Sequence, residues 1–199
     1  MVKIGEFLSF NKRYLDRLLS GRKNVTIRVG KVEVKPGKTV FIECGGKVVA
    51  KAKIVDVKYK RVSELTKSDA VKDGFRSRKE LLKALKRHYG QLSPNTKVTI
   101  IKFRVTKRFK EKLPPEEARL GGYKPVEIAR YALAYQINLS DEEKRVLAQL
   151  LTTGNLTATA LALGDPSKRV LVRDVVKKAY KELLKKGLIK PRLKELEEG

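Results

Sequence analysis

The 199-residue sequence has no tryptophan and only one cysteine, one histidine and one methionine. The lone cysteine, Cys44, cannot form an intramolecular disulfide, and with the lone histidine, His88, it cannot assemble the Cys and His cluster of a structural zinc site. A catalytic Ser-His-Asp arrangement is disfavoured by the same scarcity. We therefore expect no metal ion and no organic cofactor.

Long hydrophobic runs are also missing. No apolar stretch approaches the roughly 20 residues that a membrane span requires, and residues 1–10 lack the apolar core of a signal peptide. Hydrophobic residues still make up 41% of the chain, which is enough for real cores. These features predict a globular cytoplasmic protein without a membrane partner. The 35% charged residues, with so few Trp, Met and Cys, are typical of thermophilic proteins.

Acidic residues are few relative to basic ones: 22 Asp and Glu against 47 Lys and Arg, a net charge of +25. Residues 1–112 hold 31 basic and 10 acidic residues, a net +21, whereas residues 113–199 hold 16 and 12, a net +4. Such a field attracts polyanions, and in the cytoplasm these are nucleic acids. A lysine-rich thermophile surface is the alternative, although such surfaces usually balance lysine with glutamate.

Proline and glycine are concentrated where the pattern changes. Leu113-Pro114-Pro115 and then Gly121-Gly122 indicate a linker over residues 111–124. We expect a first domain at residues 1–110 and a helical second domain at residues 125–199.

The first domain is predicted to be α+β. Phe7 to Phe10 reads as a strand, and Thr39–Cys44 and Lys47–Val57 as a hairpin turning at Gly45-Gly46. Residues 95–107 form a further strand, in which the apolar parity changes between positions 100 and 101, so a bulge or burial on both faces is expected there. Short strands closed by hairpins favour a small β-barrel. Helix N-caps are expected at positions 11, 63, 68 and 77.

The stretch from Gly21 to Arg28 organises this domain. Gly21 ends a helix, and the alternation of Val25, Thr26, Ile27 and Arg28 predicts a strand. Thr26 and Arg28 therefore share one face, and the turn before them brings Lys23 toward it. The alternative is that both cations belong to a generally basic surface.

The pattern G-x-K-x-x-x-x-R, formed by Gly21, Lys23 and Arg28, resembles the signature of the ASCH domain, a relative of the PUA-type RNA-binding barrels. The Asp73-Gly74-Phe75 segment, the following helix and the strand at residues 98–105 resemble that family in order and spacing. The resemblance covers roughly residues 1–107 and implies a PUA-like barrel with a cleft beside the signature.

Two hypotheses of function follow for the cleft. In the first, it binds nucleic acid, with RNA favoured over DNA: basic residues hold the phosphates, and an unstacked base enters near Thr26 and stacks on Tyr14, Phe75 or Tyr89. Helix or strand core positions are the alternative for these aromatic residues. The candidate phosphate contacts are Arg13, Arg17, Arg22, Lys23, Arg28, Lys51, Lys53, Arg76, Arg78, Lys83, Arg87, Arg173, Lys177 and Lys181.

In the second hypothesis the resemblance implies an amidohydrolase that removes acetyl from N4-acetylcytidine. Thr26 matches the nucleophile, Lys23 the base that activates it, and Glu80 the acidic residue. Against this interpretation, Glu80 also suits the third position of a capping box that begins at Ser77.

The second domain is similar to helix-turn-helix or winged-helix domains, with Leu188 to Lys190 in the place of a first wing strand. On its long helix, Arg173, Lys177 and Lys181 form a basic stripe that suits a nucleic-acid groove. The alternatives for this domain are a solvated helix face or a protein-docking module. A third hypothesis for the whole protein is a factor associated with the ribosome or with another protein.

Overall fold

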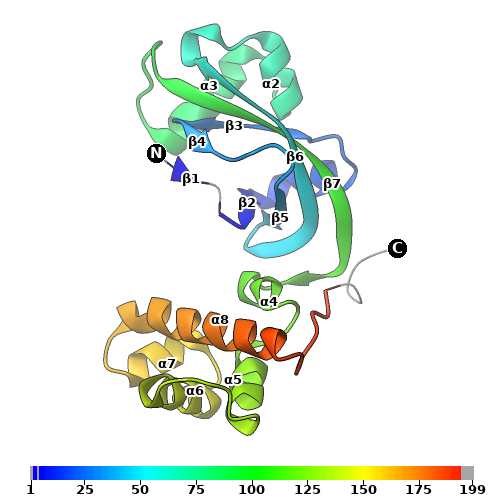
Figure 1. Ribbon diagram of the computed structural model, residues 1–199. Helices are drawn as coiled ribbons and strands as arrows, with labels where there is room; N and C mark the ends of the chain where they lie inside the picture. Colours follow the sequence, from blue (N-terminus) through cyan, green and yellow to red (C-terminus); the bar gives the residue numbers. More distant parts are fainter. Residues whose placement is uncertain (1, 4, 194–199) are drawn as a thin grey trace. The chain divides into compact units, whose positions relative to one another are not determined.

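The computed structural model describes residues 2–3 and 5–193, so the expected domain limits at residues 1 and 199 lie outside the described residues. The chain divides into two compact units, one ending at Lys112 and the other beginning at Leu113. Figure 1 shows the strands in the first unit and a set of helices in the second. Each unit is described by itself.

The first unit is built around a five-stranded mixed sheet (Figure 1). β2 runs parallel to β5, whereas β5 pairs antiparallel with β6 and β3 pairs antiparallel with β7. β6 and β7 are neighbours in the sheet. The α+β class is therefore confirmed. The strand order is β2 (Phe7–Phe10), β5 (Thr39–Cys44), β6 (Lys47–Arg61), β7 (Lys97–Leu113) and β3 (Val25–Val29).

The expected closed barrel is wrong. In the described residues, β2 and β3 are the two edges of an open sheet and no strand pairing joins them. Short strands β1 (Val2–Lys3) and β4 (Val32–Glu33) form a separate parallel pair. The two edges are bridged by a side chain, because the Arg28 guanidinium on β3 donates a hydrogen bond to the Ser9 carbonyl on β2. Side chains in place of a backbone ladder leave room for a pocket there.

The hairpin between β5 and β6 turns where the sequence indicates. Gly45 and Gly46 have φ of 61° and 80°, the left-handed conformations that a tight hairpin turn requires and that glycine adopts without steric cost. A Cβ at Gly45 would lie 3.0 Å from Lys12 Cβ. This close approach fixes the start of the 3₁₀ segment η1 (Lys12–Tyr14) against the hairpin.

β7 and β3 lie between two cores. Their register is regular, with Ile27 opposite Ile100 and Thr26 opposite Ile101. The change of apolar parity between positions 100 and 101 is therefore not caused by a bulge against β3. Ile101 packs with Leu18, Ile42 and Phe103 in one core, whereas Ile100 packs with Leu81 and Leu85 in the other. Burial on both faces is the alternative that the structure supports. Fully burying one such side chain stabilises the fold by roughly 1.5–3 kcal/mol.

Three helical segments of the first unit begin at a polar N-cap residue. The Asn11 side chain accepts from Arg13 N at 3.1 Å, and the Ser77 side chain accepts from Glu80 N at 3.1 Å, as expected. The caps expected at positions 63 and 68 are wrong, because Thr66 caps the second helix by accepting from Asp69 N. The segments are η1 (Lys12–Tyr14), α1 (Leu15–Leu19), η2 (Val62–Glu64), α2 (Lys67–Asp73) and α3 (Arg78–Tyr89).

The second unit is helical. Its core gathers buried side chains from four helices, α5 to α8, including Ile128, Leu147, Leu150 and Leu183. The region expected as a linker holds the end of β7 and the short helix α4. The helices are α4 (Pro115–Arg119), α5 (Pro125–Ala134), α6 (Asp141–Thr153), α7 (Leu156–Ala162), η3 (Pro166–Lys168) and α8 (Arg169–Lys185).

The expected wing strand at Leu188 to Lys190 is wrong, because these residues form no strand in the described chain. The Lys190 carbonyl accepts from the Tyr123 hydroxyl at 2.9 Å, and Arg192 N donates to the Gly121 carbonyl at 2.7 Å. Ile189 is buried in the helical core. The segment therefore closes that core rather than starting a sheet. Of the helices described, none is long and apolar enough to cross a membrane.

Candidate functional site

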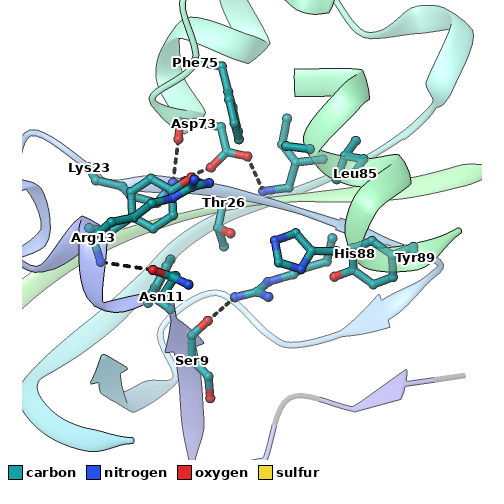
Figure 2. A pocket seen from close by; sticks show the side chains of 15 residues that line it. Ser9, Asn11, Arg13, Lys23, Thr26, Asp73, Phe75, Leu85, His88 and Tyr89 are labelled. Carbon is teal, nitrogen blue, oxygen red and sulfur yellow. Dashed lines mark hydrogen bonds and ion pairs between the residues drawn. The ribbon is translucent and has the colours of Figure 1, made fainter. Parts of the chain in front are cut away.

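A pocket of about 300 Å³ lies where the two open edges of the sheet, β2 and β3, approach the helices (Figure 2). β2 contributes Ser9 and Phe10, and β3 contributes Thr26, Ile27 and Arg28. We call it the β2–β3 pocket. The remaining lining residues come from the η1 region, the end of α2 and the end of α3: Asn11, Arg13, Tyr14, Lys23, Asp73, Phe75, Ala84, Leu85, His88 and Tyr89.

Lys23 is buried in the pocket, with 3% of its surface exposed. The turn after α1 carries it inward, since Lys23 N donates to the Arg17 carbonyl at 2.7 Å. Its ammonium donates to the Asp73 carbonyl at 2.6 Å, to the Val25 carbonyl at 3.2 Å and to the Asp73 carboxylate. An ammonium has three donors, so this geometry uses all of them.

The Lys23–Asp73 pair is a buried ion pair whose members are each pushed toward neutrality. Burial lowers the pKa of Lys23 below its ordinary 10.5, against the opposing pull of Asp73, and Arg28 and Arg17 lower it further. Burial likewise raises the pKa of Asp73 above 3.8, against the opposing effect of Lys23 and of the Ile27 N–H. For each group, desolvation of the charged form outweighs the stabilising effect of its partner, so the pKa of each group is shifted toward the neutral form.

Thr26 lies on β3, lines the same pocket as Lys23 and Asp73, and is 5% exposed. Figure 2 shows Thr26 close to the Lys23 and Asp73 side chains. The structure thus brings Lys23, Thr26 and Arg28 to one pocket, as the strand alternation predicts.

Arginine side chains and aromatic rings form the more open part of the pocket. Arg13 donates to the Tyr14 hydroxyl at 2.8 Å and its guanidinium carbon lies 4.8 Å from the centre of that ring. Arg28 lies over the Phe10 ring at 5.6 Å. The Lys23 ammonium is 4.7 Å from the Tyr14 ring centre. The cations are thus held on aromatic faces, which orients them while leaving Arg13 exposed.

All three aromatic residues considered for base stacking, Tyr14, Phe75 and Tyr89, line the pocket. His88 lies beside Tyr89 at the end of α3 and also lines it. From the sequence this histidine is only a helix-end residue. The position of His88 in the pocket depends on how α3 packs against β3, where Leu81 and Leu85 share a core with Ile27. No local sequence pattern encodes this packing.

Glu80, the acidic residue expected in the second hypothesis, does not line the pocket. Its carboxylate accepts a hydrogen bond from Arg76 N at 2.8 Å. In a full capping box the donor would be the N–H of the N-cap residue, Ser77, one position later. Asp73 takes the position beside Lys23 instead. Sequence reasoning missed this role because Asp73 resembles an ordinary helix-end residue before Gly74, and its partner lies 50 residues away.

Several other expected phosphate contacts are engaged elsewhere. Arg78 donates to the Leu65 carbonyl at 2.6 Å, Arg17 to the Gly74 carbonyl at 3.1 Å, and Arg22 to Ser20 Oγ at 3.0 Å. Of the predicted set, Arg13, Lys23 and Arg28 line the β2–β3 pocket. The others lie outside it: Arg17, Arg22, Lys51, Lys53, Arg76, Arg78, Lys83 and Arg87 in the first unit, and Arg173, Lys177 and Lys181 on α8.

No group of three or more His, Cys, Asp or Glu side chains that could hold a metal ion occurs within residues 2–3 and 5–193. The β2–β3 pocket presents several kinds of functional group. It offers two guanidinium groups for anions, aromatic faces for a planar ligand, and a hydroxyl beside a lysine–carboxylate pair.

Comparison with known proteins gives one family. The family model described as the ASCH domain matches residues 5–107, slightly more than half of the chain. No curated protein matches the sequence.

Similar solved structures include an ASCH domain from Lactobacillus crispatus, which is 13% identical, with 50% of this chain and 79% of that chain covered and a TM-score of 0.44. ASCH from Zymomonas mobilis is 14% identical, with 60% and 80% covered and a TM-score of 0.44. A protein from Enterococcus faecalis is 19% identical, with 50% and 74% covered and a TM-score of 0.43.

Proposed function

Because the chain belongs to the ASCH-domain family, we propose that it binds RNA and that the β2–β3 pocket receives an unstacked base. ASCH domains are associated with nucleic-acid binding. The observation that carries the proposal is the composition of the pocket, in which exposed Arg13 and half-buried Arg28 stand beside Tyr14, Phe75 and Tyr89. Single-stranded nucleic acid is bound by this combination of cations for the backbone and aromatic faces for the bases.

The mechanism is electrostatic capture followed by base insertion. The net +21 of residues 1–112 attracts the polyanion. Arg13 and Arg28 then hold phosphates at the pocket mouth, and a base stacks on the tyrosines. A duplex has to unpair and unstack before a base can enter such a pocket, so single-stranded or looped RNA is preferred over duplex DNA.

The test removes the two guanidinium groups together. We expect Arg13→Ala/Arg28→Ala to weaken binding of single-stranded RNA by about tenfold or more, since each charge-assisted contact contributes roughly 1 kcal/mol or more. Fluorescence anisotropy with labelled single-stranded RNA, structured RNA and duplex DNA measures this. Lys35→Ala/Lys47→Ala is the matched control, because it removes the same charge from exposed residues outside the pocket.

Equal weakening in both double variants would show that only the general field of the domain matters, and would contradict a site in the β2–β3 pocket. Binding of duplex DNA as tight as that of single-stranded RNA would contradict base insertion.

A second candidate function is the removal of acetyl from N4-acetylcytidine. It is favoured by the position of Lys23, Asp73 and Thr26 in one pocket and by the burial of Lys23, which lowers the pKa of its ammonium. In this scheme Lys23 takes the proton from the Thr26 hydroxyl as its oxygen attacks the acetyl carbon, and then gives that proton to the N4 nitrogen as the bond to the acetyl group breaks. Cytidine leaves with a neutral amino group, and water hydrolyses the acetyl ester on Thr26 to release acetate. Asp73 takes the role first assigned to Glu80 and holds or relays the proton.

The assay for this candidate is release of acetate from N4-acetylcytidine. Thr26→Val keeps the shape of the side chain and removes the attacking oxygen, so activity should disappear while folding and RNA binding persist. Acetate release that persists in Thr26→Val excludes Thr26 as the nucleophile.

For the second unit we propose an independent domain of the helix-turn-helix type, in which Arg173, Lys177 and Lys181 of α8 face a partner. The support is their regular four-residue spacing on one helix. A nucleic acid, a protein or the ribosome fits this surface, and the small net charge of +4 for residues 113–199 makes its contribution to RNA affinity secondary.

A further inference from the structure

Tyr59, on β6, is an exposed aromatic residue that the β2–β3 pocket does not use. Half of its surface, 50%, is open to solvent. Its hydroxyl donates to the Val32 carbonyl at 3.1 Å, which anchors the tip of the ring to strand β4. The ring therefore presents a face whose orientation is already set, so little conformational entropy is lost when a ligand covers it.

Basic side chains surround this ring. An open pocket of about 300 Å³, which we call the Tyr59 pocket, is lined by Lys31, Tyr59, Lys60, Arg61, Glu64 and Lys97. The Lys31 ammonium lies 5.8 Å from the centre of the ring.

The charges of this pocket are only partly balanced. Lys60 donates to Asp69 Oδ2 at 2.7 Å, and the Glu64 carboxylate accepts from Arg61 N at 2.6 Å. Across the described ranges, the side chains of Lys31, Arg61 and Lys97 form no ion pair with an acidic residue. The pocket thus holds three exposed cations around a stacking face, the combination that binds single strands without a specific sequence.

The Tyr59 pocket is close to the β2–β3 pocket along the chain. Arg28 lines one and Lys31 lines the other. Three residues span at most roughly 11 Å even when fully extended, so one short single strand reaches both.

We propose that the Tyr59 pocket is a second subsite for single-stranded RNA, in which a base stacks on Tyr59 and the flanking phosphates contact Lys31, Arg61 and Lys97. This inference rests on the proposed function, since it extends the path of the same RNA beyond the base held between β2 and β3. It makes the RNA site longer than one base pocket and identifies the ligand as a strand rather than a free nucleoside.

The test compares oligonucleotides of two lengths, about 4 and about 16 nucleotides, the range that single-strand sites of this size cover. Anisotropy is measured for the whole protein and for Tyr59→Leu, which removes the stacking face but keeps an apolar side chain. Tyr59→Phe keeps the ring and removes only the hydroxyl. Tyr135→Leu is the matched control, because Tyr135 is 52% exposed and lies on the second unit.

We expect Tyr59→Leu to weaken binding of the long RNA about tenfold. Tyr59→Phe should weaken it less, because the ring stays and only its anchoring hydrogen bond is lost, and Tyr135→Leu should bind like the unaltered protein. Lys31→Gln/Lys97→Gln, which leaves the ring in place, should weaken it similarly and gives an independent reading if the leucine variant folds poorly. The 4-nucleotide RNA should depend on Arg13 and Arg28 and not on Tyr59.

Long RNA that binds Tyr59→Leu and Lys31→Gln/Lys97→Gln as tightly as the unaltered protein would overturn the second subsite while leaving the proposed function intact. An equal loss in Tyr135→Leu would also overturn it, because the effect would then not belong to this pocket. If the unaltered protein binds RNA of neither length, the proposed function itself fails.

Discussion

At the scale of single residues, the site depends on a charge pair that is expensive to bury. The side chains of Lys23 and Asp73 are 3% and 7% exposed. The Lys23 ammonium also lies over the Phe10 and Tyr14 rings and donates to the carbonyl of Val25, the first residue of β3. Replacement of such pairs by apolar residues is often neutral for stability, whereas removal of one partner is costly. A pair of this kind beside a pocket is therefore more informative about function than about stability.

We expect Asp73→Ala to lower the free energy of unfolding by about 3–5 kcal/mol, because it leaves the Lys23 ammonium buried without its carboxylate. Lys23→Met should cost a similar amount. The double variant Lys23→Met/Asp73→Ala should cost less than the sum of the two single changes. Urea denaturation of the four proteins measures this coupling.

The control for this cycle is Asp56→Ala. Asp56 pairs with Lys58 at 3.5 Å, and both side chains are largely exposed, so the change should cost about 0–1 kcal/mol. Additive single changes at Lys23 and Asp73 would contradict a direct interaction between them.

The same pair predicts a pH dependence of stability. The pKa of Asp73 is raised above 3.8 in the folded protein, so the folded state binds this proton more tightly than the unfolded state. Its favourable contribution is complete below pH 3.8 and is lost as the pH rises through the raised pKa. Over this range the unaltered protein should lose stability relative to Lys23→Met/Asp73→Ala.

At the alkaline end the sign reverses. The pKa of Lys23 is lowered from 10.5, so stability should rise, relative to the same double variant, between the lowered pKa and pH 10.5. Thermal unfolding across pH for both proteins checks both ends. A difference between the two proteins that stays constant with pH would show that neither group titrates differently on folding.

At the scale of elements, local patterns predict more than long-range pairing. Strand β2, the β5–β6 hairpin and the Ser77 cap of α3 follow from alternation, paired glycines and a polar residue before an apolar stripe. The open sheet does not follow, because closure depends on whether β2 and β3 meet. The 14 residues of helix and turn between Phe10 and Val25 contain no local pattern that reports this. Asp73 was missed for the same reason.

Caps give a direct test at this scale. Thr66 is the N-cap of α2, so Thr66→Ala should lower the free energy of unfolding by about 1 kcal/mol. Ser68, the cap expected from the sequence, lies inside the helix and is exposed, so Ser68→Ala should change stability by less than about 0.5 kcal/mol. Chemical denaturation distinguishes the two, and a larger loss at Ser68 would contradict the helix start at Lys67.

At the scale of the whole molecule, charge is divided unevenly between the two units. Cations of the second unit are often paired with acidic residues: Lys178 with Glu143 at 2.7 Å, Arg192 with Glu127 at 3.0 Å, and Arg169 with Glu116 at 3.5 Å. The first unit carries most of the excess charge and both pockets described above. The charge division could be read from the sequence, whereas the pairing could not.

This division predicts unequal effects of charge removal. Arg173→Ala/Lys181→Ala on α8 should weaken RNA binding less than threefold, whereas Arg13→Ala/Arg28→Ala should weaken it by about tenfold or more. Anisotropy with the same RNA compares them. A larger effect of the α8 variant would place the main RNA contact on the second unit.

The most direct measurement of the central claim is the salt dependence of RNA affinity. Each phosphate contact on a single strand contributes about −0.7 to the slope of log affinity against log salt. If Arg13 and Arg28 hold phosphates at the β2–β3 pocket, the slope for Arg13→Ala/Arg28→Ala should be shallower by roughly 1.4, and that for Lys35→Ala/Lys47→Ala should be unchanged. A slope that is the same for the unaltered protein and the Arg13→Ala/Arg28→Ala variant would contradict RNA binding at this pocket.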